Sequence, residues 1–306
     1  MIGIALSRLL AALHCTQPAP ALDACVASLE RSAWPSVAAC WSRLTPTGFP
    51  IEITVSNADR YLCWSAEIAP PEVPESDRLP LVAKEMAAHG QPLDPGVQAR
   101  LQALQRSADL KFGAWIGGRE AVDVPPRFKL YAELPAGAGI DALPIPDALR
   151  QACRHAPFGA RPRLLGIEPA RGRTEIYLRL PTSNIESLVP LAGAASLAHG
   201  LTTALDRHLP DGRRRLAGRR LGASLAWSAD GTFEIALFAS ARTLFPGAPE
   251  ILHRLVPTSR AAEAVHGRYG LVTIGFEPDG ASLRLAVGLV PRIVIEVDDG
   301  GLPRSE

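Results

Sequence analysis

The chain has 306 residues, of which 47 % are hydrophobic and 21 % are charged, so it can bury a large core. Its formal net charge of +1 gives no overall attraction to nucleic acid or to an anionic membrane. No apolar run approaches the length of a membrane-spanning helix. These totals predict a globular, cytoplasmic protein with neither a nucleic-acid nor a membrane partner, and we expect a monomer.

The cysteines are odd in number, widely spaced and without a CxxC pair. They are Cys15, Cys25, Cys40, Cys63 and Cys153. This pattern argues against a disulfide scaffold and against a zinc site, so we interpret them as buried, reduced thiols. The apolar segment at 1–13 is interrupted by Arg8 and follows no basic segment, so we do not expect a secretory signal.

Along the first third of the chain, segments with helical spacing of apolar residues are followed by segments with strand-like alternation. Residues 21–44 have helix-like apolar spacing broken by Pro35, and predict one or two helices. Residues 51–56 and 60–68 alternate around a turn at 57–59 and predict a hairpin. After a proline-rich loop, 76–90 and 94–108 predict two helices, with Ser76 and Asp94 as N-caps and Gly90 as a stop.

The same order continues to the end of the chain. The second hairpin is expected from 112–118 and 127–135, with a longer connection that contains Pro125-Pro126. A helix at 141–156 precedes a third hairpin, 162–168 with 174–181. Helical residues 183–208 precede a fourth hairpin, 221–228 with 232–240. Helical residues 247–266 precede a fifth, 268–277 with 282–289, and a last apolar run covers 292–297.

A unit of helical segment and β-hairpin therefore repeats five times, about every 50 residues. Ten antiparallel strands leave no bare edge when they close into a ring, and helices between the hairpins then surround it. The predicted fold class is α+β: a ten-stranded antiparallel β-barrel with a wide lumen, ringed by α-helices. We expect one domain over 1–298 and a polar tail over 299–306.

The two faces of the strands differ in character. In 282–289 the leucines and Val287 form one face, and Arg284, Ala286 and Gly288 form the other. Strand 51–56 likewise sets Ile51 and Ile53 against Glu52 and other polar residues. We expect helices to cover the bulky apolar faces and the small or polar faces to line the lumen.

Basic and aromatic side chains recur on the predicted lumen face. They are Arg60, Arg127, Lys129, Arg179 and Arg284, with Tyr131 and Tyr177 among them. Buried cations need an anion, and guanidinium and ammonium groups bind phosphate oxygens well, so a diphosphate is the expected ligand. The alternative is internal pairing with Glu52, Glu133, Glu175 and Glu234.

The architecture and these motifs together resemble the ABBA-fold aromatic prenyltransferases, whose ααββ repeats close a ten-stranded barrel. Lys129-Leu-Tyr131 looks like the family's Lys-x-Tyr strand motif, and Glu52 looks like its first-strand glutamate. Arg173-x-Glu175-x-Tyr177 partly matches an Arg-x-Lys-x-Tyr strand. The compact length is more like the branch that prenylates ribosomal peptides.

The resemblance implies electrophilic transfer of a prenyl group from a prenyl diphosphate to an aromatic or nitrogen nucleophile of a natural product or peptide. It assigns the diphosphate to Arg60, Lys129, Arg179 and Arg284, and the shielding of the allylic cation to Tyr131, Tyr177 and Trp64. Glu52 would orient the acceptor and accept its proton. No tightly bound cofactor is implied; magnesium would come with the diphosphate.

The chain departs from the family pattern in three places. Glu175 stands where the pattern has lysine, strand 233–239 has no tyrosine, and strand 282–289 offers Arg284 rather than tyrosines. The second hypothesis is therefore a non-catalytic barrel that binds an apolar or anionic metabolite. Lys129 and Arg284 discriminate between the two: unpaired in the lumen they indicate an anion site, whereas neutralisation by lumen glutamates weakens the enzyme hypothesis.

Overall fold

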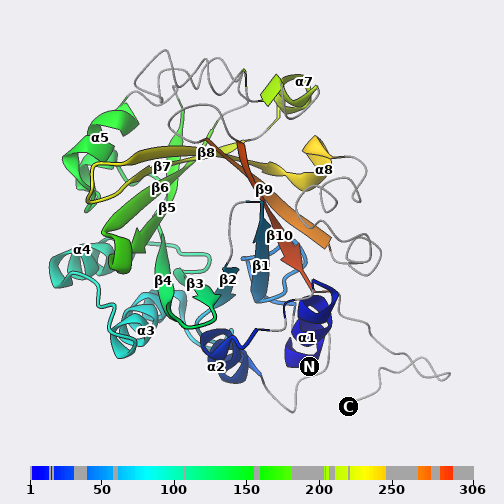
Figure 1. The fold of residues 1–306 in the computed structure, drawn as a ribbon. Coiled ribbons are helices and arrows are strands. Elements are labelled where there is room, and N and C mark those ends of the chain that lie inside the picture. The colour runs from blue at the N-terminus through cyan, green and yellow to red at the C-terminus, as the bar shows by residue number, and fades with distance from the viewer. Residues whose placement is uncertain are drawn as a thin grey trace.

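The computed structural model describes residues 2–13, 15, 17–30, 40–57, 61–106, 108–154, 159–180, 203, 205–206, 211–219, 221–245, 268–276 and 283–291. Within them, ten antiparallel strands close one barrel in the order β1-β10-β9-β8-β7-β6-β5-β4-β3-β2 (Figure 1). Each strand pairs with its neighbours in sequence, and β1 closes the ring by pairing Ile53 with Leu289 of β10. The predicted fold class is confirmed.

The strands form five hairpins. They are β1 (Ile51–Ser56) with β2 (Leu62–Glu67), β3 (Ala114–Ala121) with β4 (Val124–Glu133), β5 (Arg161–Glu168) with β6 (Arg173–Arg179), β7 (Gly222–Trp227) with β8 (Phe233–Ser240), and β9 (Arg268–Phe276) with β10 (Leu283–Val290). Helices and short turns occupy the connections and lie outside the ring of strands (Figure 1). They are α1 (Ile2–Ala12), α2 (Pro20–Leu29), α3 (Glu75–Ala88), α4 (Pro95–Gln105), η2 (Ile140–Ala142), α5 (Asp147–Arg154), η3 (Pro169–Arg171), α7 (Gly212–Leu216) and α8 (Ala241–Leu244).

Successive side chains along each strand point alternately to the helices outside the barrel and to the lumen. On β1, Ile51 and Ile53 are at most 1 % exposed and belong to the core, whereas Glu52 and Thr54 line the central cavity. Full burial of such an aliphatic side chain contributes about 1.5–3 kcal/mol. The core is therefore a layer between barrel and helices, which leaves the lumen free for polar side chains.

Helix α2 is attached to the barrel through a buried carboxylate. Glu120 of β3 accepts the backbone N–H groups of Ala21 and Leu22 at 3.1 and 3.0 Å, and also the Trp64 Nε1–H at 2.8 Å. The N-terminal N–H groups of a helix have no partner within the helix, so this carboxylate satisfies two of them.

Two local expectations need correction, and one helix was not predicted. The apolar segment at the N-terminus, for which no secondary structure was predicted, forms helix α1. The N-cap of α3 is Pro74 rather than Ser76, whereas Asp94 caps α4 by accepting the Val97 N–H at 2.8 Å.

The connection of the second hairpin is shorter than expected. It comprises only 122–123, with Asp123 at a φ of 61°, and Pro125-Pro126 lies inside β4. Pairing of β4 with β5 begins at Leu130, and the register of β4 with β3 shifts between Arg119 and Ala121. The prolines therefore have no regular pair on either side, and their missing N–H groups are tolerated.

Some expectations fall outside the described residues. They concern most of the helix at 183–208, the helix at 247–266, the run at 292–297, the tail at 299–306 and Arg60. Among the helices that the structure describes, none is long and apolar enough to cross a membrane.

Candidate active site in the barrel lumen

The barrel encloses a cavity of about 810 Å³ that all ten strands border, together with the loop at 43–46. This volume lies in the upper part of the range of small-molecule sites, roughly 300–1,000 Å³. We call the end where the hairpins turn, marked by Arg119, Arg127 and Arg173, the turn end. Glu52, Arg179 and Gly222 lie toward the opposite end, where the first strand of each hairpin begins and the second ends.

A chain of alternating charges crosses the lumen near the turn end on every second strand. Lys129 of β4 pairs with Glu175 of β6, which also lies 3.4 Å from Arg173 of the same strand. Arg173 continues to Glu234 of β8, whose other oxygen is 3.3 Å from Arg284 of β10. Three cations thus alternate with two carboxylates, so the chain carries one net positive charge.

Glu175 is the centre of this network. Burial alone would raise its pKa, but the charges of Lys129 and Arg173 and a hydrogen bond from Ser224 hold the pKa well below its usual range. The pKa of Glu234 is lowered in the same way by Arg173 and Arg284, against its own burial. Both carboxylates therefore stay ionised at any ordinary pH and neutralise part of the lumen's positive charge.

By the criterion set from the sequence, this pairing weakens the enzyme hypothesis, since Lys129 and Arg284 each meet a lumen glutamate. The other two glutamates that were expected to pair with lumen cations do not do so. Glu133 accepts the backbone N–H groups of 111–113, and Glu52 has no polar partner in the described part of the chain. Lumen glutamates therefore pair with some of the lumen cations, but not with all of them.

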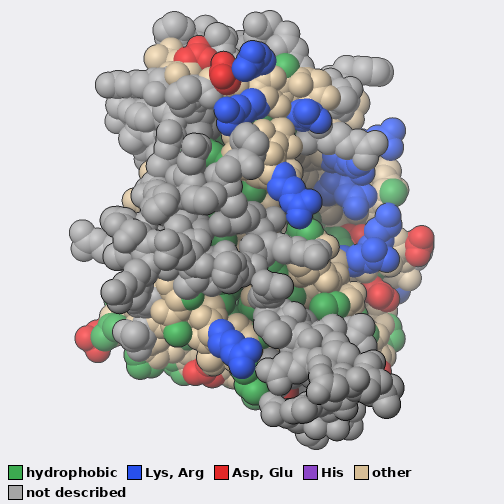
Figure 2. Space-filling view, turned by 90° about the vertical axis from the view of Figure 1, so that its right-hand side faces the viewer, with side chains coloured by type: hydrophobic (Ala, Val, Ile, Leu, Met, Phe, Trp, Pro, Cys, Tyr) green, Lys and Arg blue, Asp and Glu red, His purple; other side chains and the backbone are tan. Residues whose placement is uncertain are grey.

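Arginines still outnumber carboxylates around the cavity. Among the described residues, nine basic side chains border it: Arg43, Arg119, Arg127, Lys129, Arg163, Arg171, Arg173, Arg179 and Arg284. The four acidic ones are Glu52, Glu168, Glu175 and Glu234. Basic side chains also gather beside a hollow on the face shown in Figure 2. A molecule of net charge +1 therefore concentrates positive charge in and around its lumen.

Arg127 is incompletely satisfied at the turn end. Its Nη1 lies 3.8 Å from Glu168 Oε1, and its guanidinium lies 4.7 Å from the centre of the Tyr61 ring. Its buried Nε and the Glu168 oxygen have no hydrogen-bond partner among the described residues. Buried polar atoms are normally bonded, so these groups are suited to a ligand with both donor and acceptor atoms.

Three aromatic rings form a wall next to the charged chain. The Tyr131 and Tyr177 ring centres are 5.9 Å apart, and Tyr177 lies 5.5 Å from Phe238 of β8. The Lys129 ammonium lies 4.9 Å from the Tyr131 ring centre and 2.9 Å from the Tyr177 hydroxyl. Phe238 was missed from the sequence because strand 233–239 was examined only for a tyrosine, although Phe238 shares the lumen face of Glu234.

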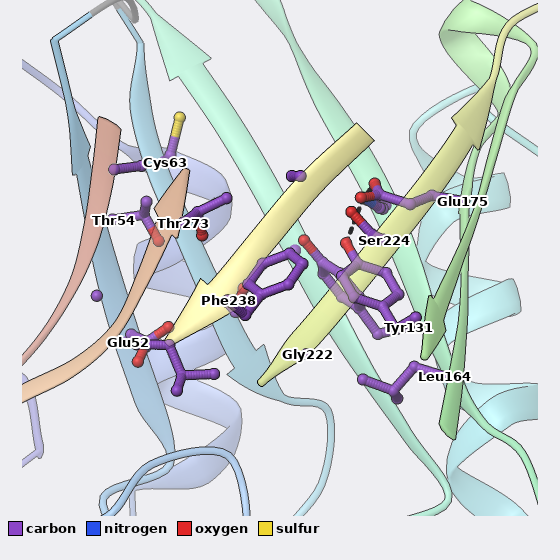
Figure 3. Close-up of a pocket in the computed structure, with 18 of the residues that line it drawn as sticks. Glu52, Thr54, Cys63, Tyr131, Leu164, Glu175, Gly222, Ser224, Phe238 and Thr273 are labelled. Carbon is purple, nitrogen blue, oxygen red and sulfur yellow. Dashed lines mark hydrogen bonds and ion pairs between the residues drawn. The ribbon is translucent and has the colours of Figure 1, made fainter. Parts of the chain in front are cut away.

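Glu52 lies across the cavity from Tyr131 (Figure 3). Burial raises the pKa of its carboxyl to about 7. A Cβ at Gly288 would come within 2.3 Å of this carboxyl, so the glycine leaves the space that the side chain occupies. Glycines serve Lys129 and Tyr131 similarly, at Gly166 and Gly117 of the adjoining strands.

The structure brings together most but not all of the residues singled out from the sequence. Glu52, Lys129, Tyr131, Tyr177 and Arg284 all border the cavity. Arg60 lies outside the described residues.

Arg179 borders the cavity but does not join the other cations. It is exposed, and it lies six residues from Arg173 along β6, which is about 20 Å of extended strand. The assignment of Arg179 and Arg284 to one diphosphate is therefore not supported, because Arg284 is linked through Glu234 to Arg173 at the turn end.

Trp64 is among the residues that border the cavity, but its indole lies in the core on the outer face of the barrel and not in the lumen as a cation shield would. It shares the outer face of β2 with Leu62 and Ala66, is 2 % exposed, and packs edge-on against Phe128. Its indole N–H is donated to Glu120 beneath helix α2. The expectation was wrong because its neighbours Cys63 and Ser65, rather than Trp64, share the phase of Glu52 and Thr54.

Among the described residues, no three His, Cys, Asp or Glu side chains are grouped as a metal site would need. Magnesium carried by a diphosphate stays a prediction, since the donor's own oxygens would supply its ligands.

No family model matches the chain, and no curated protein matches it. Solved structures do match. 5-dimethylallyl tryptophan synthase from Streptomyces coelicolor, in complex with DMASPP and Trp, is 15 % identical, with a TM-score of 0.67 over 96 % of this chain and 97 % of that chain. The prenyltransferase PriB, in complex with L-tryptophan and dimethylallyl thiolodiphosphate, is 18 % identical, with a TM-score of 0.67 over 97 % and 100 %.

A third match is 6-dimethylallyltryptophan synthase from Micromonospora olivasterospora, 16 % identical, with a TM-score of 0.61 over 93 % of this chain and 94 % of that chain. At these identities the likeness establishes the fold alone. The chain has the barrel architecture of these enzymes over nearly its whole length, as the resemblance implied.

Proposed function

We propose that this barrel transfers a prenyl group from a prenyl diphosphate to an aromatic acceptor. The observation that carries the proposal is the combination of groups in one lumen: an excess of cations, a wall of three aromatic rings beside them, and across from Tyr131 a carboxyl with no polar partner among the described residues. Prenyl transfer needs these three elements around one reaction centre. The solved structures of similar fold, which hold a prenyl diphosphate analogue and tryptophan, support the same assignment.

The reaction begins when the bond between the allylic carbon and the diphosphate oxygen breaks. Negative charge then develops on the diphosphate, and Lys129, Arg127 and Arg284 lie at the end of the lumen where it can be stabilised. Arg173 holds Glu175 and Glu234 and contributes to the same field. Because the network keeps two carboxylates, the donor must draw its cations partly away from them.

The allylic cation that remains needs electron-rich surfaces and no water. Tyr131, Tyr177 and Phe238 provide π faces, and a cation held over such a ring is stabilised by about 0.5–2 kcal/mol per ring. Tyr177 stays a neutral phenol, since its burial and the charge of Glu175 raise its pKa well above the usual value.

Glu52 acts in the last step of the reaction, the removal of a proton from the acceptor. The π electrons of the acceptor form the new carbon–carbon bond, and the ring carbon then loses its proton to a base to recover aromaticity. A carboxyl with a pKa of about 7 is close to the value at which a general base works best at neutral pH. We infer that Glu52 takes this proton.

The experiment is a transfer assay with purified protein, dimethylallyl or geranyl diphosphate, and tryptophan, indole or a tryptophan-containing peptide. We expect a prenylated product by mass spectrometry, together with released diphosphate. Glu52→Gln should lower product formation about 100-fold while leaving donor binding intact. Absence of transfer to every acceptor, with Glu52→Gln indistinguishable from the unaltered chain, would contradict the proposal.

The ion pairs of Lys129 and Arg284 favour a second candidate, a non-catalytic barrel that binds an anionic or apolar metabolite. That function needs no base, so it leaves the isolated, high-pKa Glu52 unexplained. Donor binding without transfer, unaffected by Glu52→Gln, would support this candidate.

A further inference from the structure

One buried carboxylate joins three parts of the chain at the end of the lumen opposite the turn end. Glu67, the last residue of β2, is 0 % exposed, and its Oε1 accepts hydrogen bonds from Ser42 Oγ at 2.6 Å and from Trp115 Nε1 at 3.0 Å. Its Oε2 pairs with Arg78 Nη1 at 2.8 Å. Ser42 lies in the segment before β1, Arg78 in α3 and Trp115 in β3. Glu67 therefore connects a loop, a helix and a strand of the barrel.

The loop that Glu67 holds borders the lumen. Residues 43–46 line the cavity, directly after the Ser42 that donates to the carboxylate. The Ser42 N–H donates to the Gly48 carbonyl at 2.7 Å and closes the loop. Gly48 has a φ of 82°, and a Cβ there would come within 2.5 Å of the Cys40 carbonyl oxygen, so the loop requires glycine at this position. The loop thus has one defined shape against the end of the barrel.

The indole that Glu67 holds lies beside the aromatic wall. Trp115 borders the cavity and is the direct cross-strand partner of Tyr131. Directly opposed residues on one face of a sheet have Cβ atoms about 5 Å apart, so Trp115 is a neighbour of the tyrosine assigned to the allylic cation. Phe112 stacks on the indole, with 3.8 Å between ring centres and 17° between ring planes. Glu67 and Phe112 together fix the Trp115 ring at this place.

Resting on the proposed function, we propose that Glu67 is a positioning residue that keeps water away from the allylic cation. Glu67 itself does not border the cavity; it holds Trp115 and the 43–46 loop as a closed wall beside Tyr131. With this wall displaced, the oxygen of a water molecule adds to the allylic carbon and the water loses a proton. The product is then a prenyl alcohol instead of a prenylated acceptor, a side reaction that closure of an active site prevents.

The chain contains a matched carboxylate that serves as the control. Glu120 of β3 is also buried, and it also accepts three hydrogen bonds, one of them from an indole N–H, that of Trp64. Its other two donors belong to α2, outside the barrel. Glu120→Ala therefore removes as many hydrogen bonds as Glu67→Ala, but it leaves Trp115 and the 43–46 loop in place.

The test is the ratio of prenyl alcohol to prenylated product that the purified protein forms from dimethylallyl diphosphate with L-tryptophan or a tryptophan-containing peptide. The reaction is run in water labelled with heavy oxygen. Attack of water on the allylic carbon labels the alcohol, whereas a contaminating phosphatase that breaks the phosphorus–oxygen bond leaves it unlabelled. Glu67→Ala should raise the ratio of labelled alcohol to product at least about fivefold, and Glu120→Ala should change it by less than about 1.5-fold.

Ser42→Ala is a milder variant that decides the question if Glu67→Ala does not fold. It removes one of the three bonds to Glu67 and loosens only the loop, so the ratio should rise about two- to threefold. Urea unfolding of each variant shows that the proteins compared are folded under the assay conditions.

The outcomes separate the two proposals. Equal ratios in Glu67→Ala and Glu120→Ala, or an unchanged ratio in Ser42→Ala, would overturn the positioning role and leave prenyl transfer standing. If the unaltered chain forms no prenylated product with any acceptor, prenyl transfer is overturned and this inference with it.

Discussion

Glu175 sets how much of the lumen's positive charge is available to a ligand. It stands between Lys129 and Arg173, and its low pKa means that it remains charged. Buried ion pairs stabilise a fold less than their geometry suggests, because desolvation offsets the attraction. Removal of one partner, in contrast, lowers the free energy of unfolding, because the remaining charges stay buried without compensation.

Glu175→Gln should therefore destabilise the free protein by about 3 kcal/mol while exposing two cations to ligand. Inorganic diphosphate should then raise the stability of the variant more than that of the unaltered chain, since an anion that binds only the folded state stabilises it. Urea unfolding with and without diphosphate measures both effects. Glu85→Gln, on an exposed helix position, is the matched control and should change stability by less than about 0.5 kcal/mol. A smaller response to diphosphate in Glu175→Gln would contradict this account of the lumen.

Glu52 makes a second residue-scale prediction, on pH. Its pKa is raised from 4.5 to about 7 in the folded chain, so between these values the unfolded chain releases a proton that the folded chain keeps. Stability should fall as pH rises through this window, and the penalty should be complete above about pH 7.

Glu52→Gln removes that penalty. Because the side chain is partly exposed, we expect the variant to be more stable by about 2 kcal/mol at pH 8, with the difference vanishing near pH 4.5. Urea unfolding at several pH values provides the measurement. A difference that does not change with pH would show that the carboxyl titrates normally and is a poor base at neutral pH.

At the scale of elements, the contact between α2 and the barrel depends on one side chain. Glu120 accepts three hydrogen bonds, two from the first turn of α2 and one from Trp64. Glu120→Ala leaves all three donors buried without a partner and should cost about 3 kcal/mol of unfolding free energy. Glu72→Ala, at an exposed loop position, should be neutral. A loss below about 1 kcal/mol in Glu120→Ala would mean that α2 is held by its apolar face alone.

The elements also show how far the sequence could be interpreted. Strict alternation located all ten strands and assigned Glu52, Lys129 and Arg284 to the lumen, because in a strand the phase decides the face. It could not predict the pairs Lys129–Glu175 and Arg284–Glu234, since these join β4 with β6 and β8 with β10, and alternation along one strand contains no information on such distances. Trp64 was assigned to the lumen without regard to its phase on the strand, and Phe238 was overlooked because its strand was examined only for a tyrosine.

At the scale of the whole molecule, closure of the barrel brings the polar faces of all ten strands around one cavity. The cations gather at the turn end, the rings of Tyr131, Tyr177 and Phe238 lie beside them, and the carboxyl of Glu52 lies across the cavity from Tyr131. Most bulky apolar side chains lie in the layer under the helices, so that glycine, alanine and threonine border the lumen beside its charged and aromatic side chains. The fold thus separates the residues that stabilise it from those that can bind a ligand.

The central claim is that a prenyl diphosphate binds at the turn end, and two arginines from the lumen test it most directly. Arg284→Gln and Arg179→Gln remove the same charge from opposite ends of the cavity, and calorimetric titration with geranyl diphosphate compares them. We expect Arg284→Gln to weaken binding about tenfold or more and Arg179→Gln to change it less than about twofold. Equal losses, or a loss in Arg179→Gln alone, would place the anion elsewhere and contradict the account.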